Sequence, residues 1–318
     1  MEQIQTRNLD ANETVFFSRE LEHIKAKTYD IKRPELKAPR LIPVSTEAGS
    51  GAETITYDQW DEVGIMKIIS NYADDLSRAD VKAKQFSSQV KSLGASYGYN
   101  VQEIRNAQKA GKSLNARKAS SVRRAYDQAV NRIAWFGQAD ANLLGMLNQP
   151  NVPAATVATG VTTSNTRWIG GTPKNADEVI TDLNDIITNI IETTNGVEHP
   201  DSLILPVAQL RHISTTQKSS ASDTTILEYF MKSNPGISNI EWVNEMKDVT
   251  PLPSGNAGTK DVMIAYRRDP EYLTLELPQP FEQFPAQERN LEFVVPTHAR
   301  IGGVIVYYPL SMRIVEGI

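Results

Sequence analysis

The sequence predicts an α+β fold, in which helices and strands alternate in the middle of the chain and strands dominate its last part. Residues 175–194 carry apolar side chains at helical spacing. Short apolar strand patterns follow this helix, and residues 271–318 contain three β-rich runs, YLTLEL, NLEFVV and IGGVIVYYPL. With 318 residues, the chain is long enough for two domains or one elaborate domain, and its core needs no disulfide or metal.

The composition excludes several classes of protein. The chain contains no cysteine, which excludes disulfides, thiolate metal sites and cysteine nucleophiles. The four histidines are far apart and none lies in an HExxH pattern, so we predict no metal and no cofactor. No apolar run approaches the roughly 18 residues of a membrane span, and the first residues lack the pattern of a signal peptide. We therefore expect a cytoplasmic protein without membrane contact.

The net charge of −5 combines two segments of opposite charge. Residues 101–137 carry eight basic and two acidic residues, whereas residues 171–261 carry six basic and thirteen acidic residues. Such a chain presents different surfaces to different partners, although two solvated faces would produce the same pattern. The overall negative charge argues against a general nucleic-acid-binding protein.

Residues 16–44 predict a short helix followed by an extended arm, because three prolines in the second half favour extended geometry. An arm of this kind buries little of its own surface, so we expect it to lie on another subunit. Its apolar candidate anchors are Leu36, Leu41 and Ile42.

Residues 55–99 predict a long two-stranded excursion. The run ITYDQWDEVGIMKIIS is rich in β-branched and aromatic residues, NYADDLSRAD is polar turn material, and VKAKQFSSQVKSLGASYGY returns with partial alternation. Two strands alone are only marginally stable in water. An excursion of this length therefore favours packing against another subunit.

Two helices are predicted after the excursion, over residues 101–110 and about 113–137. Asn100 with Glu103 fits a capping box at the start of the first helix, and Gly137 predicts the end of the second.

The longer helix carries a basic stripe opposite its apolar face. Arg117, Arg124 and Arg132 lie on one side of a helical wheel, within roughly an 80° sector at 100° per residue. Trp135 falls on this polar side, where exposure would be costly, so another segment must cover it.

The following segments alternate between helix and strand. A strong amphipathic helix covers 175–194 and ends at Gly196. After it we predict a strand over 202–206, a short helix over 206–214, a helix over 223–233 capped by Ser222, and strands over 239–246 and 261–267.

Two glycine-containing patterns resemble catalytic motifs but lack the required context. Residues 94–98 match the GxSxG nucleophile elbow around Ser96, but an elbow follows a buried apolar strand and KQFSSQVKSL is polar. Residues 111–113 resemble the end of a Walker A loop, but Asn106 stands where that pattern has glycine. Both patterns therefore favour a structural interpretation.

The remaining titratable candidates are equally weak. The acidic pairs at 61–62 and 74–75 lie in polar turns, where carboxylates are usually solvated. His212, beside Arg211 on a short helix, is more typical of a surface or interface residue than of a ligand. Because nothing assembles a nucleophile, a base and oxyanion donors, we predict that the protein is not an enzyme.

The order of several segments resembles tailed-phage major capsid proteins of the Hong Kong 97 capsid fold, and more narrowly a phage capsid family long catalogued as a domain of unknown function. The resemblance covers nearly the whole chain. Its segments are FFSRELEHIKAKTYDIKRPELKAPRLIPV, ITYDQWDEVG, NRIAWFG, GMLNQPNV, SASDTTILEYF and THARIGGVIVYYPLSMRI.

This resemblance implies a division of the chain into four parts. They are an N-terminal arm (1–52), an extended E-loop hairpin over a neighbouring subunit (53–99), a peripheral domain (100–171 and 271–318) with a long spine helix at about 113–137, and an axial α/β domain (172–270) that meets its copies around five-fold and six-fold axes.

The resemblance also implies a function. The chain would self-assemble, as pentamers and hexamers, into the icosahedral head shell of a tailed bacteriophage around double-stranded DNA. Separate scaffold, portal and decoration proteins would be further partners, and the location would be the virion after assembly in the host cytoplasm. The alternatives are an encapsulin-like protein compartment, a scaffold or decoration protein that binds a shell, and a hydrolase that uses Ser96.

The resemblance also implies contacts for two sets of residues, the arginines of the spine helix and the lysines of the E-loop. The spine helix would face the shell interior, so Arg117, Arg124 and Arg132 would meet DNA phosphates without reading sequence. Alternatively, these arginines pair with acidic residues of the same or a neighbouring subunit. Some relatives cross-link an E-loop lysine to an asparagine, and none of the candidates here matches that motif: Lys67, Lys82, Lys84 and Lys91.

Overall fold

The computed structural model describes residues 31–64, 80–110, 114–221 and 223–318. The chain divides into two compact units, residues 1–35 and 36–318. The second unit holds two hydrophobic cores and every helix and strand that the described residues form. The helix predicted at the start of the arm lies outside the described residues.

A five-stranded sheet separates the two hydrophobic cores. Ile204 and Ile264 belong to one core, and their chain neighbours Leu203 and Met263 belong to the other. Because both faces of the sheet are covered, its central strand is apolar throughout instead of alternating with polar residues. In sheet order the strands are β5 (Ala154–Thr156), β14 (Arg313–Glu316), β8 (Val262–Tyr266), β6 (Ser202–Leu205) and β7 (Asn239–Trp242).

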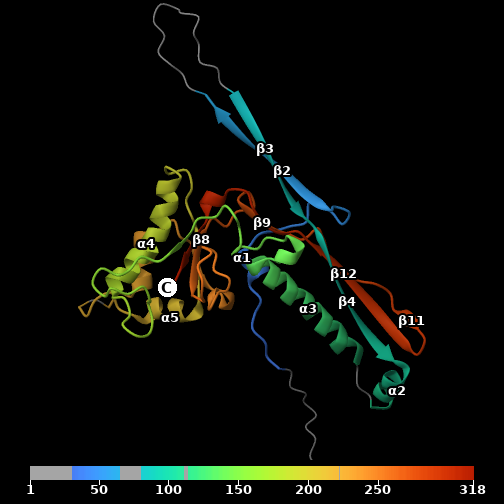
Figure 1. Ribbon diagram of the computed structural model, residues 1–318. Coiled ribbons are helices and arrows are strands. Elements are labelled where there is room, and N and C mark those ends of the chain that lie inside the picture. Colours follow the sequence, from blue (N-terminus) through green and yellow to red (C-terminus); the bar gives the residue numbers. More distant parts are fainter. Residues whose placement is uncertain (1–30, 65–79, 111–113, 222) are drawn as a thin grey trace, which may run out of the picture. The chain divides into compact units, whose positions relative to one another are not determined.

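Three helices, α4 (Ala176–Thr193), α5 (Val207–Thr215) and α6 (Ile226–Ser233), bury apolar side chains against one face of this sheet (Figure 1). α4 begins where the sequence predicts it, and Asn175 is its N-cap. The Asn175 side chain accepts a hydrogen bond from the backbone N–H of Glu178, and the Glu178 carboxylate accepts one from the backbone N–H of Asn175. This capping box satisfies two of the free N–H groups at the helix start.

The predicted cap of α6 at Ser222 is wrong. Thr225 is the N-cap, because its hydroxyl accepts a hydrogen bond from the backbone N–H of Glu228 at 3.2 Å. The Glu228 carboxylate in turn accepts from the backbone N–H of Thr225, also at 3.2 Å. Threonine followed by glutamate three residues later is the usual capping box, so this signal was present in the sequence. Ser222 itself lies outside the described residues.

A second sheet is organised around two long strands, β4 (Lys91–Asn100) and β12 (Glu292–Ile301), which are antiparallel over ten residue pairs. The sequence analysis placed β4 in the two-stranded excursion. The structure differs because Leu93 packs against the subunit's own core and Tyr99, on the same side of the strand, is buried. Two short strands also pair with β12, namely β10 (Gln279–Gln283) and β11 (Gln287–Arg289).

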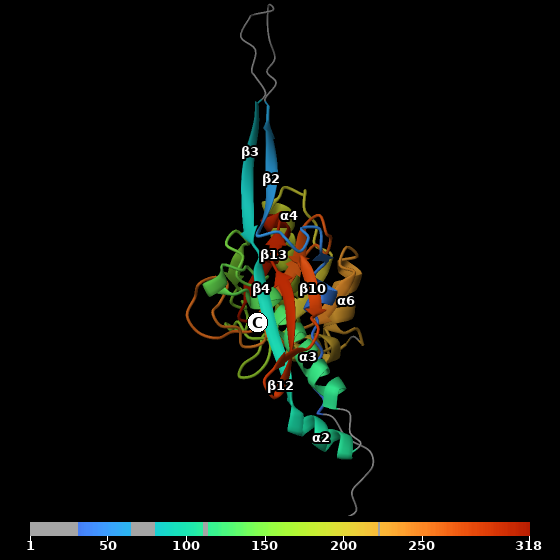
Figure 2. The same cartoon turned by 90° about the vertical axis from the view of Figure 1, so that its right-hand side faces the viewer.

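The two helices predicted after the excursion are confirmed as α2 (Val101–Ala110) and α3 (Leu114–Phe136). α3 packs along the sheet of β4 and β12 (Figure 2). It ends at Gly137, whose φ of +65° is a left-handed conformation. A Cβ at this position would clash with the carbonyl oxygen of Leu143, so glycine is required there.

The smaller elements complete the second unit. β1 (Val44–Ser45) is parallel to β9 (Leu273–Glu276), which is antiparallel to β13 (Gly303–Val306). β2 (Thr54–Val63) and β3 (Asp80–Gln89) form a separate antiparallel ribbon. Four short helical turns are α1 (Ala38–Leu41), η1 (Ala139–Ala141), η2 (Asn244–Met246) and η3 (Pro309–Ser311).

The five-stranded sheet extends beyond the predicted axial domain, residues 172–270. β14 pairs with β8 inside that range but comes from the C-terminal segment, and β5 pairs with β14 from the other side. Boundaries at 171 and 271 therefore separate two of the five strands from their sheet. The other predicted domain limits stay a prediction.

Candidate assembly surfaces

The ribbon of β2 and β3 has two faces of different composition. Tyr57 lies opposite Phe86, and Trp60 lies opposite Ala83 on the other face, because successive residues of a strand point to opposite sides. The rings of Tyr57 and Phe86 stack with centroids 5.2 Å apart, and Tyr57 meets Tyr307 edge-on at 4.9 Å. This aromatic face connects the ribbon to the rest of the subunit.

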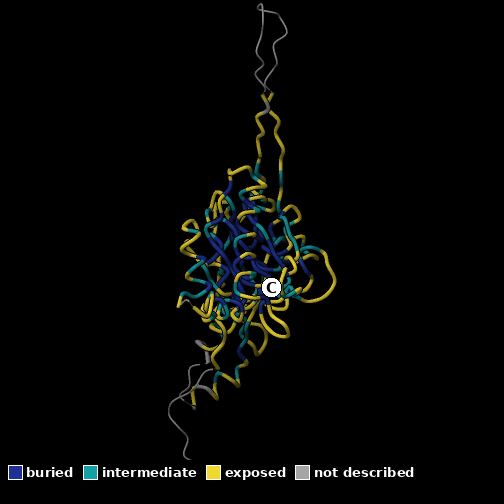
Figure 3. Tube along the Cα trace, turned by 90° about the vertical axis from the view of Figure 1, so that its left-hand side faces the viewer, coloured by how far each residue is buried: buried dark blue, intermediate teal, exposed yellow. Residues whose placement is uncertain are grey.

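The other face carries an exposed apolar patch, which we call the ribbon patch and define as Trp60, Val81 and Ala83. Trp60 is 66% exposed and Val81 is 52% exposed. Figure 3 shows that most of the described ribbon is exposed, in contrast to the buried centre of the subunit. Exposed apolar groups that gather in one place are typical of protein–protein contacts.

The root of the ribbon is fixed to its own subunit. The Ser88 hydroxyl donates a hydrogen bond to the carbonyl oxygen of Gly302 at 3.1 Å, and the Val90 N–H donates to the carbonyl oxygen of Glu53 at 2.8 Å. A Cβ on Gly302 would lie 3.1 Å from the Cδ1 of Ile55, so the strands approach closely at this glycine. The root is therefore part of the subunit core, whereas the ribbon patch is not.

The structure brings the three predicted arginines to one side of α3. Arg117 and Arg132 are exposed, and Arg124 is half-buried. On the opposite side, Val130 and Ile133 are buried in the core. The exposed side of α3 therefore presents basic side chains to solvent.

Another basic residue of this helix has a local structural role that the sequence analysis missed. Arg123 lies 3.4 Å from the carboxylate of Asp127, one turn further along α3. Its guanidinium also covers the ring of Phe281 in β10, 5.2 Å from the centroid. A cation between a carboxylate and an aromatic face is stabilised by both.

Lys118 connects α3 to α2 and β4. Its Nζ donates to the carbonyl oxygen of Gly98 at 2.7 Å and lies 2.8 Å from the carboxylate of Glu103. The hydrogen bond from Lys118 is the main reason that the pKa of Glu103 is lowered. Part of the positive charge of residues 101–137 is therefore neutralised within the subunit.

Trp135 is fully buried, as we expected for a tryptophan on the polar side of the helical wheel. The chain folds back over the end of α3 after Gly137. The backbone N–H of Met146 donates to the carbonyl oxygen of Ala134, and that of Leu147 donates to the carbonyl oxygen of Trp135, both at 2.8 Å.

Two of the three arm anchors lie in the core of their own subunit. Leu41 is 5% exposed and Ile42 is 0% exposed, and the hydroxyl of Tyr266 donates to the carbonyl oxygen of Leu41 at 2.9 Å. Pro39 lies in the first turn of α1, where proline fits a helix, so it does not extend the chain here. Leu36 is half-buried. Leu41 and Ile42 therefore stabilise the subunit itself instead of reaching a neighbour.

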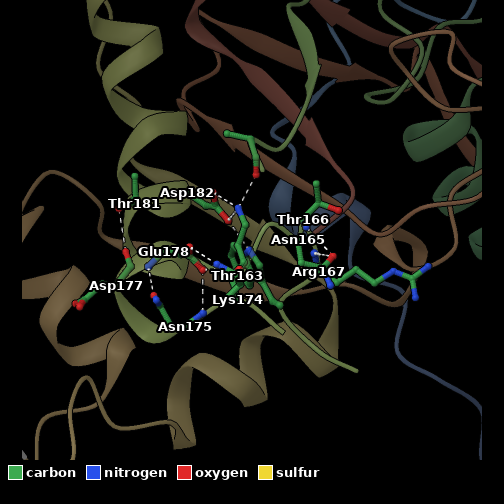
Figure 4. Close-up of polar contacts among 12 residues, drawn as sticks. Thr163, Asn165, Thr166, Arg167, Lys174, Asn175, Asp177, Glu178, Thr181 and Asp182 are labelled. Atoms are coloured by element: carbon green, nitrogen blue, oxygen red, sulfur yellow. Dashed lines mark hydrogen bonds and ion pairs between the residues drawn. The ribbon is translucent and has the colours of Figure 1, made fainter. Parts of the chain in front are cut away.

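A buried ion pair holds the loop of residues 157–174 against α4 (Figure 4). The Nζ of Lys174 lies 2.7 Å from both carboxylate oxygens of Asp182, and the two side chains are 1% and 3% exposed. Lys174 also donates to the carbonyl oxygen of Ala158, and the indole N–H of Trp168 donates to Asp182, each at 2.7 Å. Every charge in this cluster has hydrogen-bond partners, as burial of an ion pair requires.

Glu178 makes a second attachment of the same loop. Its carboxylate accepts hydrogen bonds from the backbone N–H groups of Thr162, Thr163 and Asn175, and from the hydroxyl of Thr163 at 2.7 Å. Burial alone would raise the pKa of Glu178, but these hydrogen bonds outweigh it and lower the pKa to about 2. The carboxylate therefore stays charged far below its ordinary range.

Replacing Glu178 by glutamine should lower the thermal midpoint of the subunit at neutral pH, because the amide lacks the charge that these donors favour. The folded pKa of about 2 lies below the ordinary value of 4.5, so the contribution is present above pH 4.5 and is lost as the pH falls towards 2. The difference in midpoint between the natural chain and Glu178→Gln should therefore shrink across this window.

Thermal melts at graded pH measure this effect. Glu192→Gln, at an exposed position of the same helix, is the matched control and should show no such window. A difference between natural chain and Glu178→Gln that is independent of pH would contradict the role assigned to the charge.

The pattern around Ser96 does not form a nucleophile elbow. Ser96 lies inside β4, opposite Pro296 of β12, and the whole of 94–98 is paired with that strand. An elbow is a sharp turn between a strand and a helix, so the geometry differs. His212 lies on α5 with its Nδ1 3.3 Å from the hydroxyl of Thr216, and burial lowers its pKa.

The other candidate residues are spread along the ribbon or are not described. Asp61 lies opposite Lys82, and Lys84 is exposed on the same strand. Residues 65–79 and 111–113, which include Lys67 and the acidic pair at 74–75, lie outside the described residues. Within the described part of the chain, no group of three or more metal-ligating side chains is found, and no helix is long and apolar enough to cross a membrane.

Comparisons with known proteins give one family for the sequence and several solved structures of similar fold. The model of the family described as major capsid protein matches residues 64–318. The capsid of Myoviridae phage XM1 is similar in structure, with a TM-score of 0.80 and 17% identity over 96% of this chain and 99% of that chain.

Two further solved structures are similar at lower identity. The capsid of an empty GTA particle gives a TM-score of 0.61 and 11% identity over 93% of this chain and 94% of that chain. Mycobacterium phage Ogopogo gives a TM-score of 0.58 and 12% identity over 96% and 100%. No curated protein matches the sequence.

Proposed function

Because the chain belongs to the major capsid protein family, we propose that its copies assemble, as pentamers and hexamers, into the icosahedral head shell of a tailed phage around double-stranded DNA. The observation that supports this most is the family match over residues 64–318, together with a fold similar to a phage capsid over 96% of the chain. The protein is a structural component of the virion. Assembly in the host cytoplasm, with separate scaffold, portal and decoration proteins, belongs to the same proposal.

The ribbon supports assembly between copies. The ribbon patch is exposed on the single subunit, and burial of a large apolar side chain contributes roughly 1.5–3 kcal/mol. Each ribbon would lie on a neighbouring copy, and each copy would receive one ribbon. Contacts of this heterologous kind close into rings when the rotation between copies divides a full turn, and pentamers and hexamers are rings of this kind.

Negative-stain microscopy of the purified protein tests this function. We expect closed shells of regular size. Shells that enclose protein instead of DNA would favour an encapsulin-like compartment. Small particles with an esterase activity that Ser96→Ala abolishes would favour a hydrolase. A protein that only binds the shells of another would be a scaffold or decoration protein.

The exposed side of α3 supports a contact with packaged DNA. Arg117 and Arg132 are both exposed on this side of the helix. Exposed arginines on one side of a helix attract phosphates by charge and hydrogen bonding, and they need no particular base sequence. If α3 faces the shell interior, this side of the helix meets the DNA.

Reversing both charges, as Arg117→Glu with Arg132→Glu, should leave empty shells intact but lower the amount of DNA retained per particle. Lys232→Glu with Lys247→Glu is the matched control, because it changes the net charge equally at exposed positions far along the chain. Absorbance and microscopy of purified particles measure both outcomes. If the variant did not assemble empty shells, the arginines would be assigned to contacts between subunits. An unchanged DNA content per particle would rule out the DNA contact.

A further inference from the structure

A groove of about 820 Å³ lies between the root of β2 and the segments around β1 and β9. Four aromatic side chains line it: Tyr57, Trp60, Tyr307 and Tyr308. Trp60 and Tyr308 are 66% and 46% exposed, so large parts of both rings are in contact with solvent. Aromatic faces attract cations, tryptophan most strongly, and guanidinium and ammonium groups are the usual partners.

Three exposed carboxylates, Glu47, Asp58 and Glu271, line the same groove. Among the residues that the structure describes, no lysine or arginine lines it, and no ion pair involves any of these three carboxylates. A groove with carboxylates and aromatic faces but without basic groups favours a cationic occupant.

We propose that this groove binds the basic segment of residues 25–33, KAKTYDIKR, from a second copy of the chain. This segment carries four basic residues and one acidic residue. Its last residues are accessible, since Lys32 and Arg33 are exposed and Ile31 is 86% exposed. The proposal rests on the assembly of copies proposed above, and it names one of the contacts between them.

The junction between arm and core favours a second copy over the chain's own segment. Lys37 is buried, with its Nζ 3.2 Å from the centroid of the Trp242 ring, and Arg40 lies 2.9 Å from the carboxylate of Glu241. These contacts hold the chain at β7, before it continues through α1 to Val44, which lines the groove. A segment from a neighbouring copy can enter the groove without disturbing this junction.

Cysteine cross-linking tests the proposal, because the natural chain contains no cysteine. A chain with Lys32→Cys is mixed with a chain with Gln59→Cys, assembled and oxidised. Gln59 lines the groove and is exposed. Disulfide-linked dimers should form several-fold more than with the matched control Gln287→Cys, an exposed position on β11. Equal yields in the two mixtures would overturn the proposal.

A single chain that carries both Lys32→Cys and Gln59→Cys tests the competing arrangement. A cross-link within one chain, seen as a monomer of altered mobility without dimers, would assign the groove to the chain's own arm and would overturn the proposal. Linked dimers and larger ladders are the expected result.

Charge reversal supplies a second, independent readout. Asp58→Lys with Glu271→Lys should reduce the cross-link between Lys32→Cys and Gln59→Cys several-fold. Lys27→Glu with Arg33→Glu on the other chain should restore it. The same reversal at Asp140 and Glu288, which are exposed and do not line the groove, should leave the yield unchanged.

The outcomes distinguish this proposal from the proposed function. Normal shells without the cross-link would overturn the groove assignment and leave the head-shell function intact. A cross-link in small oligomers that never close would support the groove and contradict the shell. A chain that stays monomeric at every concentration would contradict both.

Discussion

Shortening the ribbon should abolish shells and leave a folded subunit. Replacing residues 59–84 by Asn-Gly joins Asp58 to Gln85, which lie opposite each other in the register, and Asn-Gly favours a two-residue hairpin turn. The ring stack of Tyr57 and Phe86 and the hydrogen bond from Ser88 are kept. The ribbon patch is removed, so the contact with a neighbouring copy is lost.

Size-exclusion chromatography, microscopy and thermal melts measure the two parts of this expectation. Shell yield should fall to background, while the thermal midpoint of the unassembled subunit should change by only a few degrees, since those of the lost residues whose burial the structure describes are exposed. Gln59→Ser with Lys84→Ser, which keeps the ribbon length and the ribbon patch, should still form shells. Normal shells from the shortened chain would show that the ribbon is dispensable, and gross unfolding would place it in the subunit core.

The sequence predicted those elements whose signals are local. The helices α3 and α4 follow from apolar spacing and from the stops at Gly137 and Gly196, all of which lie within a few residues of the helix. The partner of β4 could not be predicted in this way. β4 and β12 are almost two hundred residues apart, and alternation alone does not specify which strand pairs with which.

The assembly surfaces were predicted less well than the fold, for the same reason. The helical wheel predicted the exposed side of α3, but it could not predict that Arg123 covers the ring of Phe281, a residue from a strand distant in the sequence. Proline content suggested an extended arm at residues where α1 and the buried Leu41 belong to the core. Such contacts depend on the tertiary arrangement, which propensities alone do not contain.

The ion pair between Lys174 and Asp182 carries the second large expected effect. Asp182→Ala leaves the ammonium of Lys174 buried with only the carbonyl oxygen of Ala158 as a partner, and it removes the acceptor of the Trp168 indole. Removing one partner of a buried pair costs about 3–5 kcal/mol, because the remaining charge is left uncompensated. We therefore expect a loss of this size in the free energy of unfolding of the unassembled subunit.

Urea unfolding of Asp182→Ala and of Asp185→Ala distinguishes the loss of the buried ion pair from a general effect of replacing an aspartate in α4. Asp185 is exposed on the same helix, so its replacement should change the free energy of unfolding by about 0.5 kcal/mol or less. Equal losses in the two variants would show that the pair contributes little.

The double variant Lys174→Met with Asp182→Leu decides whether the charges themselves stabilise the loop. Replacing a whole buried pair by apolar side chains of similar volume is often neutral, so most of the single-variant loss should be recovered. The indole N–H of Trp168 would still lack an acceptor, which costs about 1–3 kcal/mol. The double variant should therefore unfold between the natural chain and Asp182→Ala. If the loss in free energy of unfolding equalled the sum of the losses of Lys174→Met alone and Asp182→Leu alone, the two charges would act independently. That result would contradict their separation of 2.7 Å.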